Sequence, residues 1–415
     1  MKKFFFFLFV AVAFAACDKG TELVVEFADL QKAEVQNKVS LKDALLYAEN
    51  CVNGINPSTR SVERKVKSTE VYVAKPVTRS AEDVEVSFYL INYEDNEGFA
   101  MVSTDSRTTA LYAYSEKGNL TTEDLENNPA LRIFIDGSIE QYQLEIASYE
   151  DGSGRLPIEL PDSSYEDIIR LPIVEYDGDY YYERRSTDII NKGALLTTYW
   201  HQRAPYGSLC PNGVAGCGPV AAAQIMAYYQ YPVQRLWHIY DWNAMTATST
   251  LNSNSQGASS AAQLIRDIGS EADAEYNEYE DPMDNTTSTR IGNMKDAFRS
   301  FGYNCGHPTS YDVNRVRENI NAERPIYIRG ENGKGGHAWV IDGYQYRGNR
   351  VTYYYTYEPY ARYDTFIESA LSYFHCNLGW GETNNEQAQN NGYYYAYSFI
   401  HNDELKVIYD IIPNE

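Results

Sequence analysis

The sequence is poor in basic residues, in metal-binding cysteine spacings and in long apolar segments. It carries 35 Lys and Arg against 58 Asp and Glu, which gives a formal net charge of −23. So acidic a chain repels nucleic acid phosphates and anionic lipid head groups, and we expect no nucleic acid partner. The six cysteines show no CxxC or Cys/His spacing typical of zinc. We therefore expect neither a structural metal nor a cofactor.

One apolar run stands at the N-terminus, where Lys2 and Lys3 precede residues 4–16. The run matches the hydrophobic core of a signal peptide and falls short of a bilayer span, which takes about 20 residues. We predict that residues 1–16 are a signal peptide and that the protein is exported. No other segment is long and apolar enough to span a membrane.

The residues after this run resemble a bacterial lipoprotein cleavage site, because small Ala15 and Ala16 precede Cys17. We expect Cys17 to be a lipid anchor, residues 17–40 to be a tether, and the lipid to be the only membrane contact. The predicted location is the envelope of a Gram-negative bacterium, at the outer membrane or surface, or outside the cell after processing. The alternative is an ordinary signal peptide cut after Ala16.

Export also permits disulfides, so the cysteines need an interpretation. If Cys17 is lipidated and Cys217 is reactive, four cysteines remain, with three possible pairings. Buried free thiols are the expectation for most of these four, which are Cys51, Cys210, Cys305 and Cys376.

A chain of 415 residues suits two or three domains. Residues 41–150 predict a small α+β domain, with helical apolar spacing at both ends and β-like runs in 86–118. Residues 151–192 are punctuated by Gly, Pro and Asp and predict an exposed linker, where an activating cleavage would act. Residues 193–415 form the larger second domain.

The strongest chemical signal is residues 216–232, GCGPVAAAQIMAYYQYP. Gly216 and Gly218 flank Cys217, and the helix-forming run that follows predicts that Cys217 lies at a helix N-terminus. The unpaired amides and the dipole of a helix start stabilise a thiolate. The alternative interpretation is a buried cysteine in a tight turn.

A reactive thiolate needs a base, and His337 is the best candidate. It follows Gly336 and opens an apolar run that predicts a core strand, with the glycine leaving the imidazole accessible. His375 is the rival candidate, since it lies two residues from Asn377.

The group that orients the base is sought in residues 375–381, HCNLGWG, where Asn377 can bond the imidazole. Cys217, His337 and Asn377 then follow the order of a Cys–His–Asn triad. Asp342 is the other possible orienting group, although its place beside Gly343 favours a role in a turn. Acyl chemistry also needs oxyanion donors, which the Cys217 amide and the Gln202 side chain can supply; a surface glutamine is the alternative for Gln202.

Several short motifs of the second domain together resemble the streptopain family of papain-like cysteine peptidases. They are WHQRAPY at 200–206, the Cys217 helix ending Tyr231-Pro232, Tyr240-Asp241-Trp242, Gly336-His337-Ala338, and Asn377 with Gly379-Trp380-Gly381. Segment 86–118 also resembles that family's pro-domain. The resemblance implies an α+β architecture: a papain-like fold whose helical subdomain carries Cys and whose antiparallel sheet carries His and Asn, preceded by a small α+β pro-domain.

The resemblance also implies roles for individual residues. Cys217 is the nucleophile, His337 the general base and acid, and Gln202 an oxyanion donor, while Asn377 helps to orient His337. Trp380 matches the second tryptophan of the family's Asn-Trp-Gly-Trp-Gly motif, whereas Leu378 replaces the first. Cleft support is expected from three residues, Trp380, Gly336 and Gly216.

The implied function is that of an exported cysteine endopeptidase acting on protein or peptide substrates. It is expected to be made as an inactive zymogen, with its own pro-domain as an intramolecular inhibitor. Two alternatives stay open: a papain-fold amidase or acyltransferase acting on non-protein amides, and a catalytically weakened binding lipoprotein of the envelope.

Overall fold

The computed structural model describes residues 37–53, 64–74, 85–150, 169–176, 179–333, 335–355, 362–380 and 390–414. The chain divides into two units, residues 1–38 and 39–415, and the second holds the elements α2 to β18. The predicted signal peptide and Cys17 lie outside the described residues. Among those residues, no helix is both long and apolar enough to cross a bilayer.

The N-terminal region, residues 39–150, is the small α+β unit that the sequence predicts. A hairpin turn after β2 is tight enough that the amide of Tyr93 donates to the carbonyl of Gly98 at 3.0 Å. Gly98 has φ of 112°, and a Cβ there would lie 2.0 Å from the carbonyl oxygen of Ser115, so only glycine fits. The elements are α2 (Leu41–Asn53), β1 (Val66–Val73), β2 (Ser87–Tyr93), η1 (Glu94–Asn96), β3 (Phe99–Ser103), β4 (Leu111–Ser115), α3 (Thr122–Asn127) and α4 (Pro129–Glu150).

The C-terminal region, residues 193–414, separates helices from a sheet. Its helices are α5 (Cys217–Tyr229), α6 (Trp242–Met245), α7 (Gln256–Glu271), η2 (Pro282–Asp284), α8 (Ile291–Ser300), α9 (Val313–Asn321) and η3 (Ala396–Phe399). Its longer strands are β13 (Ile326–Glu331), β14 (Gly336–Tyr355), β15 (Arg362–Asn377), β16 (Gly392–Tyr395) and β17 (Lys406–Ile408). Short strands complete it: β7 (Gln234–Arg235), β8 (His238–Ile239), β9 (Glu275–Asn277), β10 (Thr286–Ser288), β11 (Tyr303–Asn304), β12 (Thr309–Ser310) and β18 (Ile412–Pro413).

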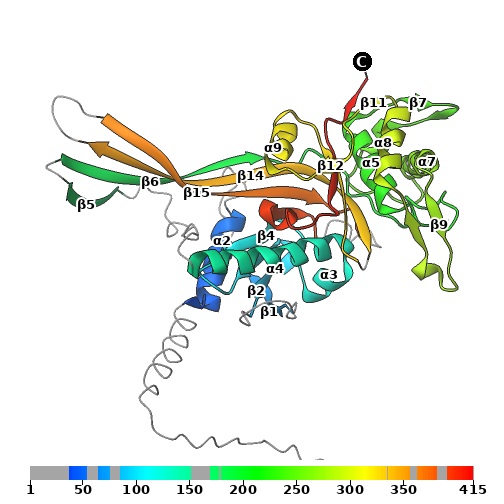
Figure 1. Ribbon diagram of the computed structural model, residues 1–415. Helices are drawn as coiled ribbons and strands as arrows, with labels where there is room; N and C mark the ends of the chain where they lie inside the picture. Colours follow the sequence, from blue (N-terminus) through cyan, green and yellow to red (C-terminus); the bar gives the residue numbers. More distant parts are fainter. Residues whose placement is uncertain are drawn as a thin grey trace, which may run out of the picture. The chain divides into compact units, whose positions relative to one another are not determined.

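One sheet runs through both regions, in the order β1-β2-β3-β4-β16-β15-β14-β13-β17-β12. The regions join where β4 pairs antiparallel with β16, with Tyr114 opposite Tyr393 and Ala113 opposite Tyr394. Figure 1 shows α4 beside the N-terminal strands and α5, α7 and α8 gathered at the far end of the C-terminal region. Because the junction is a strand ladder, the two regions are hydrogen-bonded through their backbones.

The connector expected over residues 151–192 contains regular strands. Strands β5 (Ile169–Tyr176) and β6 (Asp179–Lys192) pair with each other, and β6 pairs with β14 from Lys192 opposite Tyr344 to Tyr181 opposite Tyr355. The tyrosines and isoleucines of β6 favour a strand, and the long β14 offers it a free edge. Figure 1 shows β5, β6, β14 and β15 extending together away from the helices.

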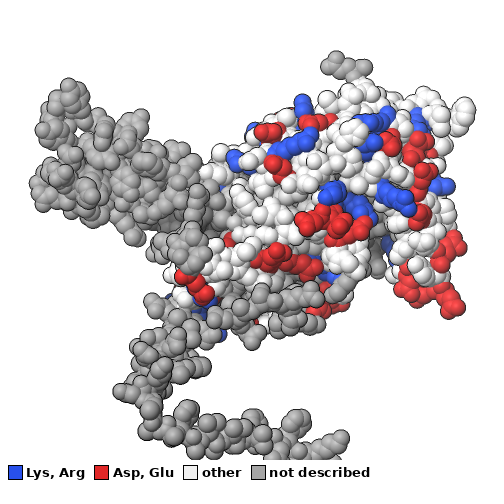
Figure 2. All heavy atoms as spheres, viewed as in Figure 1, with Lys and Arg blue, Asp and Glu red and all other residues white. Residues whose placement is uncertain are grey.

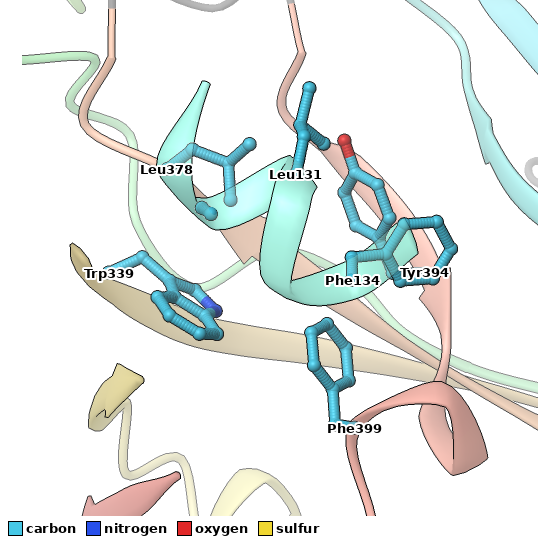
Figure 3. A pocket seen from close by; sticks show the side chains of 7 residues that line it. Leu131, Phe134, Trp339, Leu378, Tyr394 and Phe399 are labelled. Carbon is cyan, nitrogen blue, oxygen red and sulfur yellow. The ribbon is translucent and has the colours of Figure 1, made fainter. Parts of the chain in front are cut away.

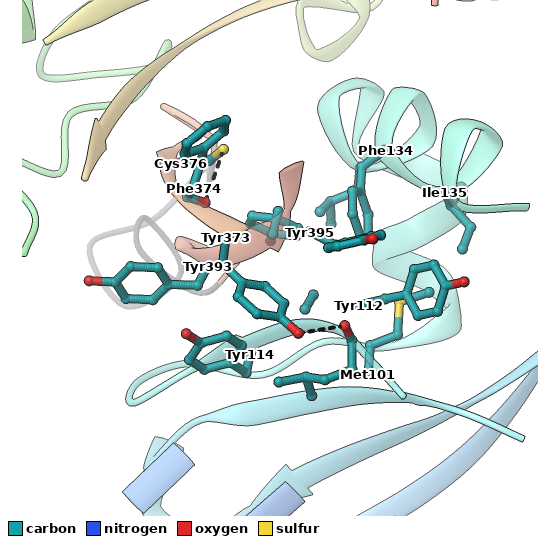
Figure 4. Packing of buried hydrophobic residues seen from close by; sticks show 14 of the residues in the cluster. Met101, Tyr112, Tyr114, Phe134, Ile135, Tyr373, Phe374, Cys376, Tyr393 and Tyr395 are labelled. Carbon is teal, nitrogen blue, oxygen red and sulfur yellow. Dashed lines mark hydrogen bonds between the residues drawn. The ribbon is translucent and has the colours of Figure 1, made fainter. Parts of the chain in front are cut away.

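Two hydrophobic clusters cover the two faces of the central strands. Ala338 and Val340 of β14 belong to the cluster of α5, α7 and α8, whereas Trp339 and Ile341 belong to the cluster that includes α4 and β4. This division follows from the alternation of side chains along a strand. Figure 4 shows the second cluster as a set of aromatic rings from both regions.

Candidate active site

Cys217 is the first residue of α5, as the sequence predicts. Gly216 precedes it with φ of 83°, and a Cβ at that position would lie 2.9 Å from the Thr287 side chain. Glycine is therefore required for the chain to enter the helix at this point. The thiol remains partly exposed and sits where the first helical amides lack intrahelical partners.

The surroundings of Cys217 favour its thiolate. Burial raises the pKa of the thiol, but the charge and hydrogen bond of His337, the amide of Ala338 and the charge of Arg329 together lower that pKa below its ordinary value. The imidazole is the largest of the lowering contributions, so the structure brings Cys217 and His337 into direct contact.

His337 lies in β14 with 1% of its surface exposed. Its Nε2 is 2.7 Å from the carbonyl oxygen of Leu378. A carbonyl only accepts, so this contact assigns the proton to Nε2 and leaves Nδ1 for the thiol. The Trp380 ring meets the imidazole edge-on at 5.5 Å between centroids, and the Trp339 ring stacks on it at 6.3 Å. The two indole rings therefore restrict the orientation of the imidazole ring.

Asn377 is buried next to this contact but bonds other groups. Its Nδ2 donates to the carbonyl of Thr198 at 2.8 Å, and its Oδ1 accepts from Gln224 Nε2 at 3.2 Å and from the Gly379 amide at 3.3 Å. The expected bond between Asn377 and the imidazole is replaced by the backbone carbonyl of Leu378. Asn377 lies opposite Val340, which belongs to the helix-side cluster, so its side chain turns towards α5.

Gln202 lies half-buried in the loop that precedes the Cys217 helix. Its carbonyl accepts from the Ala215 amide at 2.8 Å, which ties the loop to the residues just before Cys217. Within the described part of the chain, its side-chain amide makes no hydrogen bond. The two N–H groups of this amide are therefore not engaged by other described residues.

The rival residues form a separate pair. His375 Nδ1 lies 2.6 Å from Asp342 Oδ1, and Asp342 Oδ2 accepts from the amide of Leu196 at 3.0 Å. Asp342 is fully buried, and these two contacts give each of its carboxylate oxygens a hydrogen-bond partner. His375 and Asp342 thus brace the chain after the connector.

The other described cysteines differ from Cys217. Cys210, Cys305 and Cys376 are free thiols, and burial raises the pKa of each of them. Only Cys217 combines a lowered thiol pKa with a histidine partner among the described cysteines. The described residues contain no group of three or more His, Cys, Asp or Glu that could hold a metal ion.

Leu378 connects the site to the N-terminal region. Its carbonyl accepts from His337, while its side chain faces Leu131 and Phe134 of α4 (Figure 3). The space among these residues is too narrow for a water molecule. Its full lining is Ala130, Leu131, Phe134, Trp339, Leu378, Tyr394 and Phe399.

The charged side chains on the surface follow a different pattern from these buried apolar contacts. Figure 2 shows acidic and basic side chains interspersed over the viewed face, with an acidic group near β9 and β10. The exposed residues of that segment include Glu275, Glu278, Glu280, Asp281 and Asp284.

Sequence reasoning missed two contributors to the site. The Leu378 carbonyl has no sequence signal, because a backbone group is common to every residue. Gln224 had one: it is the only polar side chain in the run Val220–Ala227 of α5, and it is fully buried.

Comparison with known proteins gives consistent matches in both regions. Residues 200–394 match the Peptidase C10 family, and residues 36–142 match the Spi protease inhibitor. The chain is 21% identical over 342 residues to the thiol protease/hemagglutinin PrtT of Porphyromonas gingivalis, covering 74% of this chain but only 34% of that protein. It is 22% identical over 358 residues to streptopain of Streptococcus pyogenes, covering 74% of this chain and 77% of streptopain.

A solved structure supports the same assignment at the level of the fold. A prointerpain A fragment from Prevotella intermedia superposes with a TM-score of 0.52 at 17% identity, covering 84% of this chain and 100% of the fragment. The expected α+β architecture is thereby confirmed. The comparisons therefore support a relationship to the streptopain family of cysteine peptidases: residues 200–394 match the Peptidase C10 family, and the preceding region matches the Spi protease inhibitor.

Proposed function

We propose that the protein is a cysteine endopeptidase made as a zymogen, with Cys217 as nucleophile and His337 as general base and acid. The observation that carries the proposal is the contact between a helix-terminal thiol of lowered pKa and a buried imidazole. Protein or peptide chains are the substrates, and the reaction needs no cofactor.

The chemistry follows from the two reacting groups. His337 takes the proton of the Cys217 thiol, and the thiolate attacks a peptide carbonyl carbon. The amide of Cys217 and the side chain of Gln202 donate to the oxyanion. When the oxyanion collapses, the C–N bond breaks and His337 gives its proton to the leaving amine. Water activated by His337 then hydrolyses the thioester and restores the thiol.

Residues around the imidazole keep it in place during this cycle. The Leu378 carbonyl fixes Nε2, and Trp380 covers the edge of the ring. Gly216 and Gly336 precede Cys217 and His337 and leave room for the protein's own side chains, because a Cβ on Gly216 would meet Thr287 and one on Gly336 would meet Glu331. Asn377 supports the segment that carries the carbonyl rather than the ring itself.

The direct test compares the wild type with Cys217→Ala on casein or gelatin. We expect the variant to fold and to lose hydrolysis, and hydrolysis by a well-folded Cys217→Ala protein would contradict the proposal. Turnover of small amides without casein cleavage would favour an amidase or acyltransferase. A wild-type Cys217 that an epoxide thiol-protease inhibitor does not label would favour a binding lipoprotein.

Latency is the second part of the proposal, with residues 41–150 as an inhibitory pro-domain. The support lies in polar contacts across the junction: Ser115 Oγ donates to the carbonyl of Asn391 at 2.8 Å, and Tyr373 Oη donates to that of Leu111 at 3.0 Å. Mixing purified residues 22–185 with mature enzyme tests this idea. Absence of inhibition would count against it.

Activation is proposed to occur by cleavage within roughly residues 183–193. The β6–β14 pairing shields most of this stretch, but residues 191–194 are exposed and the strand ends at Lys192. Cleavage at this end of the connector therefore disturbs the sheet least. The mature enzyme then begins close to Gly193.

Export and anchoring complete the proposal. We propose that residues 1–16 direct export and that Cys17 carries a lipid that tethers the protein to the envelope. Metabolic labelling with a radioactive fatty acid tests the anchor, with Cys17→Ser as the matched variant. Equal label in both proteins would contradict the anchor without affecting the peptidase assignment.

A further inference from the structure

Gln224 is a fully buried polar side chain on the helix that begins with Cys217. Its Oε1 accepts from the Trp200 amide at 3.0 Å and from Thr198 Oγ1 at 3.2 Å. A buried amide of this kind costs stability unless its donors and acceptors are paired, so its position calls for an explanation.

The remaining bonds of Gln224 go to Asn377. Gln224 Nε2 donates to Asn377 Oδ1 at 3.2 Å, and Asn377 Nδ2 donates to Gln224 Oε1 at 3.3 Å. Each amide thus acts as both donor and acceptor for the other. This reciprocal pair joins helix α5 to the end of strand β15, so it connects the element that carries Cys217 to the residue before Leu378.

The segment after Asn377 is bent by local bonds. Asn377 Oδ1 also accepts from the Gly379 amide at 3.3 Å, and Gly379 has φ of 57°. Leu378 lies between them, and its carbonyl accepts from His337 Nε2 at 2.7 Å. The direction of that carbonyl is therefore set by the Asn377 amide, which Gln224 in turn holds.

We propose that Gln224 is a positioning residue for the Cys217–His337 pair. It acts through Asn377 and the Leu378 peptide: the amide pair keeps the Leu378 carbonyl aimed at Nε2, which keeps Nδ1 turned to the thiol. The inference rests on the proposed function, because it concerns the same nucleophile and base. Gln224 lies on the same helix as Cys217. One rigid helix therefore places both the Cys217 thiol and, through Asn377, the Leu378 carbonyl that accepts from His337.

The test measures the rate at which iodoacetamide alkylates Cys217 as a function of pH in the full-length chain. Mass spectrometry of the Cys217 peptide separates this thiol from the others. We expect Gln224→Leu to slow alkylation at pH 6 by about tenfold and to move the midpoint of the profile upwards, because the imidazolium is no longer held. Asn377→Leu should give the same change, and the double variant should be no slower than either single variant.

Two further variants test whether the effect is specific to the amide pair of Gln224 and Asn377. Gln224→Glu keeps the acceptor for Trp200 and Thr198 but loses the amide donor to Asn377, so it should slow alkylation even where Gln224→Leu fails to fold. Gln263→Leu is the matched control, since Gln263 donates to Asp267 at 2.9 Å on α7 and makes no bond to Asn377. Its profile should equal that of the wild type.

The outcomes separate this inference from the proposed function. A wild-type profile like that of an ordinary free thiol would contradict the Cys217–His337 pair itself. A shifted wild-type profile that both Gln224→Leu and Gln224→Glu leave unchanged, in folded protein, would overturn only the role of Gln224. Additive effects of Gln224→Leu and Asn377→Leu would also overturn it, since residues that act through one pair are not additive.

Discussion

The two faces of strand β14 are covered by different parts of the chain. On one face, Ala338 and Val340 pack with α5, α7 and α8, which belong to the peptidase region itself. On the other face, Trp339 and Ile341 belong to the cluster that includes α4 and β4 of the pro-domain together with α9 and β17 of the peptidase region. The first face is thus covered within the peptidase region, whereas the second is covered in part by the pro-domain. The pro-domain therefore supplies part of the hydrophobic core of the precursor.

The chemistry of the two faces differs accordingly. The helix side is rich in small aliphatic residues around α5, whereas the pro-domain side is built from aromatic pairs, such as Phe134 with Tyr394 at 4.8 Å and Tyr114 with Tyr393 at 5.3 Å. Tyrosine buries a large apolar ring and retains a hydroxyl that water can solvate.

The candidate site lies where these two faces meet. We expect the largest loss of activity from a substitution in the Cys217–His337 pair itself. His337→Ala removes the main group that lowers the pKa of Cys217 while burial still raises it. The thiol pKa should therefore rise, thiolate at neutral pH should fall, and hydrolysis should drop about 10²- to 10⁴-fold. Casein hydrolysis and the alkylation profile of Cys217 check this prediction.

His375→Ala is the matched control for that prediction. Its partner is Asp342, at 2.6 Å, so its loss should lower stability but leave the pH profile of Cys217 in place. If the pH profile of Cys217 alkylation stayed normal in His337→Ala and was lost in His375→Ala, His375 rather than His337 would be the base.

A change on the pro-domain side should weaken latency instead. Gly137 lies in α4, and a Cβ there would stand 1.8 Å from the carbonyl oxygen of Ser398. Gly137→Ala should therefore force the helix away from η3, at a cost of about 1–3 kcal/mol, or roughly 5- to 150-fold in the inhibition constant of residues 22–185. Titrating mature enzyme with the variant fragment measures it.

Gly292→Ala supplies the control for this substitution. Gly292 is also helical, but a Cβ there has no heavy atom within 4 Å. Placed in the peptidase region, it should leave inhibition unchanged and stabilise α8 slightly. Unaltered inhibition by the Gly137→Ala fragment would show that α4 does not dock as described.

The smallest expected effect comes from a single hydroxyl at the same contact. Ser138 Oγ lies 2.9 Å from Ser398 Oγ, and both residues are fully buried. Ser138→Ala should weaken inhibition by about 1 kcal/mol, roughly fivefold, because Ser398 loses a buried partner. The same titration detects the change, and a fragment as potent as the wild type would place the interface elsewhere.

Sequence predicted the parts of the molecule that local chemistry specifies. The start of α5 at Cys217, the β14 strand behind His337 and a helix at the end of residues 41–150, which is α4, follow from capping and hydrophobic spacing. The partner of His337 could not be predicted, since Leu378 acts through its backbone. Likewise, the strand β6 could not be predicted within the exposed linker, because its pairing depends on β14, far away in the sequence.

Leu378 illustrates both sides of the comparison. In the sequence, it replaces the first tryptophan of the family motif. In the structure, Trp380 and Trp339 cover His337, while the Leu378 side chain faces α4. One residue therefore belongs to the site through its carbonyl and to the pro-domain face through its side chain.

The central claim is that Cys217 acts on peptide bonds, including those of the chain's own connector. The most direct measurement is to incubate the purified precursor and its Cys217→Ala variant, and to determine the N-terminal sequence of every fragment. We predict that the wild type yields a fragment that begins close to Gly193, while Cys217→Ala stays intact until wild-type enzyme is added. Self-processing of Cys217→Ala at the wild-type rate would contradict the account.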